Sequence, residues 1–125
     1  MIDGRIYKLK ERLLEIPEHK WTIEEMCKIV GLSPVHFQRV FKLNVGMSPM
    51  AFLLHARLKK ACYLLETTFI QIKQIGIQTG LINNSHLTRD FKNKYGTTPV
   101  EYRKRYWDAL QGNAAVDKKR LDPPT

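Results

Sequence analysis

Apolar residues recur along this chain at spacings of three and four, the period of an α-helix with one buried face. The pattern predicts an all-α fold of about seven helices. A first helix is expected over residues 3–16, capped by Asp3 and stopped by Pro17. Its buried face should consist of Ile6, Leu9, Leu13 and Ile16.

The chain also contains an internal repeat. The segment GLSPVHFQRVFKLNVGMSP, residues 31–49, returns as GLINNSHLTRDFKNKYGTTP, residues 80–99, with one extra residue after the shared Gly-Leu pair. A repeat of this kind is one supersecondary unit used twice. The architecture is therefore expected to consist of two similar lobes.

In the first copy, a short helix, a glycine turn and a second helix are predicted within residues 22–44. Thr22 and Glu25 have the spacing of a capping box, and Gly31 is placed to end the helix. Ser33 should cap the next helix, with Pro34 at its first position. This is helix-turn-helix geometry. The second helix has an inner face of Phe37, Val40 and Phe41 and an outer face of Val35, Gln38, Arg39 and Lys42.

The second copy, about residues 70–95, repeats these features. Gly76 takes the position of Cys27, where only a small residue lets two helices approach, and Asn83 or Asn84 should cap the second helix. Leu87, Phe91 and Tyr95 are expected to be buried. The opposite face carries Ser85, Thr88, Arg89 and Lys92, at the spacing seen in the first copy.

A longer helix should link the copies over about residues 49–66, starting at Ser48-Pro49. It is expected to bury Phe52, Leu53, Ala56, Leu58, Ala61, Cys62 and Leu65. A last helix should start at Pro99 behind Thr97 or Thr98, with Tyr102 and Tyr106 inside. The predicted organisation is a first lobe with the linking helix (1–66), a second lobe (67–110) and a disordered tail (111–125).

The charge distribution points to a polyanionic partner. The formal net charge is +9, and Glu66 is the only acidic residue between Glu25 and Asp90, whereas eight Lys and Arg residues lie there. No apolar run is long enough to span a bilayer, and no signal peptide is apparent. Cys27 and Cys62 are interpreted as reduced packing residues of a cytoplasmic protein.

Arginine and glutamine on an outward helix face suit base readout in a DNA major groove, where Arg can bond guanine and Gln can bond adenine. Two such helices about 34 Å apart would enter successive grooves on one side of a duplex. The backbone N–H groups near Ser33, Ser48, Asn83 and Thr98 are placed to hold phosphates. Phosphate neutralisation is assigned to Lys42, Lys59, Lys60 and Lys92, and His36, which matches His86, is also expected to face the backbone.

The motif I-x-x-I-[small]-x-x-x-G-[apolar], then [FL]-x-R-x-F-K, then G-x-[ST]-P-x-x-[YF] runs from Ile72 to Tyr102 and again from Ile23 to Phe52. This pattern resembles the DNA-binding domain of AraC/XylS-type bacterial transcription regulators. The resemblance implies a seven-helix domain that binds promoter DNA, with RNA polymerase as a further partner and location on the nucleoid. It also implies base contacts by the outward positions, here Val35, Gln38, Arg39, Asn84, Ser85, Thr88 and Arg89.

Two departures from the family pattern affect single residues. Val35 is apolar where a polar or aromatic residue often stands, so its contact is expected to be a thymine methyl group. Asp90 follows Arg89 where Val40 stands in the first copy, and it should either restrain Arg89 or lie at the lobe edge. Members of the family usually carry a sensor or dimerisation domain. The chain is therefore either a stand-alone regulator or a fragment of a longer one, and its start within the domain favours a fragment.

Other functions fit the sequence less well. The four histidines are scattered without metal-ligand spacing or a catalytic constellation, so no enzymatic activity, metal or cofactor is expected. RNA is disfavoured because its narrow major groove does not admit a helix. The main alternative is a basic helical module that binds an acidic protein or binds DNA non-specifically. Such a module would not require matching Arg residues on two equivalent helices, so the presence of both Arg39 and Arg89 favours base readout.

Overall fold

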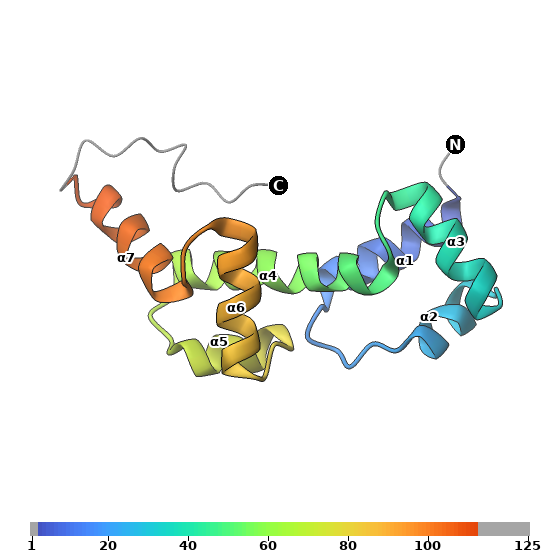
Figure 1. The fold of residues 1–125 in the computed structure, drawn as a ribbon, viewed down its shortest axis with the longest axis horizontal. Coiled ribbons are helices and arrows are strands. Elements are labelled where there is room, and N and C mark those ends of the chain that lie inside the picture. The colour runs from blue at the N-terminus through green and yellow to red at the C-terminus, as the bar shows by residue number, and fades with distance from the viewer. Residues whose placement is uncertain (1–2, 113–125) are drawn as a thin grey trace. The chain divides into compact units, whose positions relative to one another are not determined.

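The computed structural model describes residues 3–112, which form seven α-helices and no strand (Figure 1). The predicted all-α fold is confirmed. The helices are α1 (Gly4–Glu15), α2 (Ile23–Val30), α3 (Pro34–Val45), α4 (Pro49–Thr67), α5 (Ile72–Thr79), α6 (Asn84–Tyr95) and α7 (Pro99–Leu110). Apart from its first two residues, the predicted disordered tail lies outside the described residues.

The chain divides into two compact units, which we call the first lobe (Met1–Arg57) and the second lobe (Leu58–Thr125). The boundary falls inside α4, whereas the sequence-based division placed the whole linking helix with the first lobe. The reason is that the second half of α4 contacts the second lobe. On α7, the hydroxyl of Tyr102 donates a hydrogen bond of 2.5 Å to the carboxylate of Glu66 on α4.

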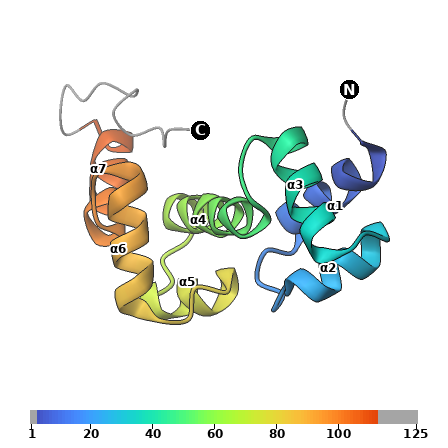
Figure 2. The ribbon, with the colours of Figure 1, turned by 45° about the vertical axis from the view of Figure 1, so that its right-hand side comes forward.

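In the first lobe, α1 packs against both α2 and α3 (Figure 2). The predicted inner face of α1 is confirmed, with Ile16 only partly buried at its end. Removing large apolar side chains from water is worth roughly 1.5–3 kcal/mol each. The core of this lobe is formed by Ile6, Leu9, Leu13, Trp21, Met26, Cys27, Val30, Phe37, Phe41, Phe52 and Leu53.

In the second lobe, α6 packs against α5 on one side and α7 on the other. Ile75, Leu87 and Phe91 are almost completely buried, and the ring of Phe91 meets that of Tyr102 edge-on at 5.5 Å. The seven residues of the linking helix that were predicted to be buried are all buried. Both cysteines are buried and free, as predicted.

The turns between the paired helices differ in the two lobes. In the first lobe, Gly31 adopts a left-handed conformation (φ +73°), and the N–H of Leu32 donates to the carbonyl of Cys27 at 3.2 Å. In the second lobe, the extra residue lengthens the turn. A Cβ on Gly76, the counterpart of Cys27, would there lie 2.6 Å from the carbonyl oxygen of Leu81. The prediction that this position requires a small residue is confirmed, and in the second lobe only glycine fits.

We expect Gly76→Ala to destabilise the protein by about 1–3 kcal/mol, because the new methyl group collides with a backbone carbonyl that cannot rotate away. Urea unfolding of the full chain measures this loss. Gly4→Ala is the matched control, since Gly4 begins a helix with open space around it. It should be neutral or slightly stabilising, by less than about 1 kcal/mol. Equal stability of the two variants would contradict the close approach at Gly76.

Candidate nucleic-acid interface

The helix α3 begins as its sequence predicts. Ser33 is the N-cap, its hydroxyl accepts a hydrogen bond from the N–H of His36 at 3.4 Å, and Pro34 occupies the first helical position. Inside the lobe, the rings of Phe37 and Phe41 are fully buried and meet edge-on at 5.7 Å. These two contacts fix the rotation of α3 about its axis.

The opposite face of α3 is open to solvent. Val35 is 83% exposed, and Gln38, Arg39 and Lys42 are exposed beside it. Residues at these spacings share one face of a helix. The first lobe therefore presents the predicted stripe as one continuous surface.

In the second lobe, α6 is built in the same way. Of the two predicted caps, Asn83 is the one that forms, and its side chain accepts from the N–H of His86 at 3.0 Å. Leu87 and Phe91 are fully buried, whereas Tyr95 is only half-buried against the ring of Phe91. On the outer face Thr88 is half-buried, and the exposed residues are Asn84, Ser85, Arg89 and Lys92.

The two equivalent arginines differ in their surroundings. Nε of Arg89 donates to Oδ1 of Asp90 at 3.2 Å. Of the two outcomes foreseen for Asp90, the structure shows the restraint of Arg89. Arg39 is followed by the half-buried Val40 and makes no hydrogen bond or ion pair with the described residues.

Four helix starts were predicted to hold phosphates. The helices behind Ser33, Ser48 and Asn83 have no acidic residue in their first turn, so the positive end of each helix dipole is not neutralised there. The cap of α7 is Thr98 rather than Thr97, and its N–H already donates to the carboxylate of Glu101 at 3.0 Å. Thr98 is thus the least suited of the four to bind an anion.

The cationic residues predicted to meet phosphates lie on α3, α4 and α6. Lys42, Lys59 and Lys92 are exposed, as is His36, whereas Lys60 is half-buried and makes a further interaction. The stretch between Glu25 and Asp90 keeps its acid-poor character at the surface. Its single carboxylate, Glu66, is engaged by Tyr102.

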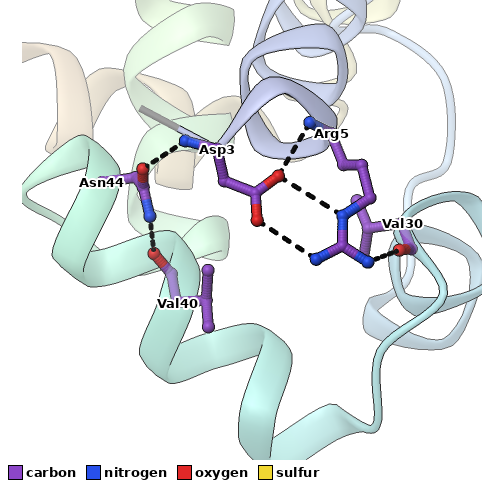
Figure 3. A network of polar contacts seen from close by, with 5 residues as sticks. All are labelled: Asp3, Arg5, Val30, Val40 and Asn44. Atoms are coloured by element: carbon purple, nitrogen blue, oxygen red, sulfur yellow. Dashed lines mark hydrogen bonds and ion pairs between the residues drawn. The ribbon is translucent and has the colours of Figure 1, made fainter. Parts of the chain in front are cut away.

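A polar network holds α1 against the ends of both helices of the first helix-turn-helix unit (Figure 3). The backbone N–H of Asp3 donates to Oδ1 of Asn44 at 2.7 Å, and Nδ2 of Asn44 donates to the carbonyl of Val40 at 2.8 Å. Arg5 pairs with the carboxylate of Asp3 and also donates to the carbonyl of Val30 at 3.2 Å. The Arg5 guanidinium lowers the pKa of Asp3 through its hydrogen bonds.

Two arginines to which sequence reasoning assigned no structural role fasten the loops in front of the helix-turn-helix units. Arg57 donates to the carbonyls of Pro17 and His19 at 2.8 and 3.0 Å, and Arg103 donates to those of Leu65 and Ile70 at 3.3 and 2.6 Å. Burial lowers the pKa of both guanidinium groups. They occupy different positions in the repeat, so the sequence carries no signal that would have paired them.

The predicted capping box at Thr22 forms only in part. Thr22 accepts from the N–H of Glu25 at 3.1 Å, but the two carboxylate oxygens of Glu25 lie 2.9 and 3.0 Å from Nε2 of His19. A complete box is instead present at Thr98 and Glu101. A partner outside the box, here six residues away, can thus withdraw a side chain from the local role that its spacing indicates.

Among residues 3–112, no group of three or more His, Cys, Asp or Glu side chains is arranged to hold a metal ion. None of the described helices is long and apolar enough to cross a membrane. The geometry defines a class of protein: two helix-turn-helix lobes, each exposing the polar face of its second helix.

Comparison with known proteins gives the family. The model of a family described as helix-turn-helix domain matches residues 26–105. The HTH-type transcriptional regulator MtrA of Neisseria gonorrhoeae is 33% identical over 102 residues, which are 82% of this chain and 34% of that protein. The chain thus spans about a third of the length of such curated relatives.

Solved structures agree with this assignment. A transcriptional regulator from Chromobacterium violaceum, described as containing an AraC-type DNA-binding domain, has a TM-score of 0.75 at 26% identity, covering 82% of this chain and 91% of that one. The DNA-binding domain of AdpA, solved with a target DNA, has a TM-score of 0.81 and covers 90% of this chain and 100% of that one. At 22% identity, this likeness shows that the two chains share a fold and shows nothing further. The chain belongs to the helix-turn-helix family and is a DNA-binding domain of the AraC/XylS type of transcription regulator.

The capping box of α7 predicts a pH dependence of stability. Hydrogen bonds from the backbone and side chain of Thr98 lower the pKa of Glu101 below its ordinary value of 4.5. A carboxyl group whose pKa is lower in the folded state stabilises the fold above its ordinary pKa and loses this effect as the pH falls through the folded-state value.

We therefore expect wild type to be more stable than Glu101→Gln at neutral pH and the difference to vanish on acidification. Urea unfolding of both proteins between about pH 7 and pH 3 measures it. Gln keeps an acceptor for the Thr98 N–H, so the comparison isolates the charge. A difference that does not change with pH would contradict the lowered pKa.

Proposed function

We propose that this chain binds double-stranded DNA sequence-specifically, with α3 and α6 as recognition helices, and that it thereby regulates transcription without enzymatic activity. The observation that carries the proposal is the duplicated exposed face. Each helix buries two large apolar residues and turns an arginine outward at the equivalent position. A partner that is itself periodic, such as the major groove of a duplex, would use both faces in the same way.

Base reading is assigned to the outward residues of the two helices. A guanidinium can bond O6 and N7 of guanine together, and Gln38 can bond N6 and N7 of adenine. Val35, exposed and apolar, suits a thymine methyl group. In the second lobe the corresponding residues are Asn84, Ser85, Thr88 and Arg89. Because the two sets differ, the half-sites should differ in sequence and the full site should lack a palindrome.

Contacts with the phosphate backbone are assigned to charged side chains and to helix starts. Exposed lysines release counterions when they neutralise phosphates, and this supplies affinity without sequence preference. Free N–H groups at a helix start add oriented donors. The proposed set is Ser33, His36, Lys42, Ser48, Lys59, Lys60, Asn83, Lys92 and, with the least support, Thr98.

A regulator that binds promoter DNA must reach the bacterial chromosome, so the proposal includes a cytoplasmic location. The match covers only about a third of the length of the regulator MtrA that resembles this chain. RNA polymerase and a sensor or dimerisation domain stay predictions for the partners of this domain.

Two substitutions separate base reading from backbone binding. Arg39→Ala should weaken binding to the preferred site by about 1–3 kcal/mol and relax the preference at one base pair. Lys59→Ala should weaken binding to all sequences alike and reduce the slope of log K against log salt by about 1. Fluorescence anisotropy with specific and random duplexes at several salt concentrations measures both. Equal losses of Arg39→Ala on specific and random DNA would remove its base-reading role.

The proposal as a whole is tested by selecting bound duplexes from a randomised pool at near-physiological salt. Two unlike half-motifs about one helical turn, or 10 base pairs, apart are expected if both lobes read sequence. One short motif would restrict base reading to a single lobe. A pool without enrichment would overturn the proposal and leave a non-specific or protein-binding module.

A further inference from the structure

The contact between Arg89 and Asp90 lies on the proposed recognition face of the second lobe, where nearly every other charge is positive. Nε of Arg89 is 3.2 Å from Oδ1 of Asp90, and the two side chains are 60% and 20% exposed. Adjacent residues on a helix point about 100° apart, so they do not face each other. The side chain of Arg89 must therefore curve around the helix to reach the carboxylate of Asp90, which is half-buried.

The first lobe provides the comparison. Arg39 occupies the position of Arg89, but the next residue is Val40, which packs toward the core and offers no acceptor. One recognition helix thus carries an exposed arginine that bonds to none of the described residues, and the other carries an arginine bonded to the next residue along the chain. The difference arises from a single residue at equivalent positions of the repeat.

The geometry of the guanidinium group determines which N–H donors of Arg89 remain available to bond a base. Arginine has five N–H donors in a planar fork, and the pair with Asp90 uses the one on Nε. The two terminal nitrogens remain, and together they match the two acceptors of a guanine edge. A carboxylate that holds Nε also restricts the torsions of the side chain, so less freedom remains to be lost when a base is bound.

The same carboxylate acts on DNA that lacks the right base. A negative charge at the recognition face is repelled by phosphates wherever the helix settles on the duplex. Where Arg89 has no guanine to bond, no favourable contact of this side chain offsets the repulsion. The repulsion lowers the affinity for every duplex without changing the ratio between them, so the gain in discrimination comes from the orientation that favours one base.

Resting on the DNA-binding function proposed above, we propose that Asp90 is a positioning residue that determines specificity in the second lobe. It orients Arg89 toward one guanine and lowers the affinity for other DNA. The first lobe, without such a residue, discriminates less strongly at the position read by Arg39.

The test compares wild type with Asp90→Asn, which keeps the size of the side chain and removes its charge. Asp108→Asn is the matched control, because Asp108 also forms an exposed ion pair in the second lobe, with Lys104 at 3.6 Å on α7. Three duplexes are needed: the selected site, the same site with the guanine read by Arg89 replaced, and a random sequence. The base to replace is the one at which Arg89→Ala loses its preference.

We expect Asp90→Asn to bind random DNA more tightly and to discriminate less between the first two duplexes, each by about two- to fivefold, the range that an exposed ion pair supplies. Asp108→Asn should leave discrimination unchanged. Thermal melting checks that the variants stay folded. Asp90→Val, which copies the first lobe, should reproduce the loss of discrimination if Asp90→Asn does not fold.

The outcomes that count against the inference are distinct from failure of the function. Wild type without any sequence preference would overturn the proposed function itself. Wild type with a preference that Asp90→Asn retains in full would overturn only the role of Asp90. An equal gain of Asp90→Asn on all three duplexes would show that the carboxylate repels phosphates without orienting Arg89, and would also overturn it.

Discussion

The burial of two large apolar side chains one turn apart is the constraint on which each lobe depends. Phe37 and Phe41 in α3, and Leu87 and Phe91 in α6, have no solvent exposure. A helix anchored at two such points cannot rotate without exposing them, at a cost of roughly 1.5–3 kcal/mol for each. The outward direction of the polar stripe is therefore a consequence of core packing.

The repeat conserves this constraint while its turns diverge. In the first lobe, the short turn closes with a hydrogen bond from Leu32 to Cys27. In the second, the additional residue Ile82 changes the path of the chain, and the carbonyl of Leu81 comes so close to Gly76 that a side chain has no room. The core contacts of α6 survive because the extra residue precedes the cap Asn83, so the helix itself keeps its register.

Local features of the fold could be predicted from the sequence because they depend on neighbours within one or two turns. The caps Asp3 and Ser33 and the buried positions of α4 belong to this group. Partners that the local spacing does not specify could not be predicted. Glu25 binds His19 instead of completing its box, and Arg57 binds carbonyls 38 and 40 residues away. The roles assigned to the outward residues stay predictions, since exposure shows availability and not contact.

The distant partners also change the meaning of the net charge. A basic chain suggests many phosphate contacts, but a guanidinium that already donates to protein carbonyls has lost part of its capacity. Arg5, Arg57 and Arg103 are engaged in this way, and Arg89 is held by a carboxylate. The salt dependence of DNA binding counts phosphates that are actually neutralised. It should therefore reflect the exposed lysines of the recognition surface far more than the formal charge of +9.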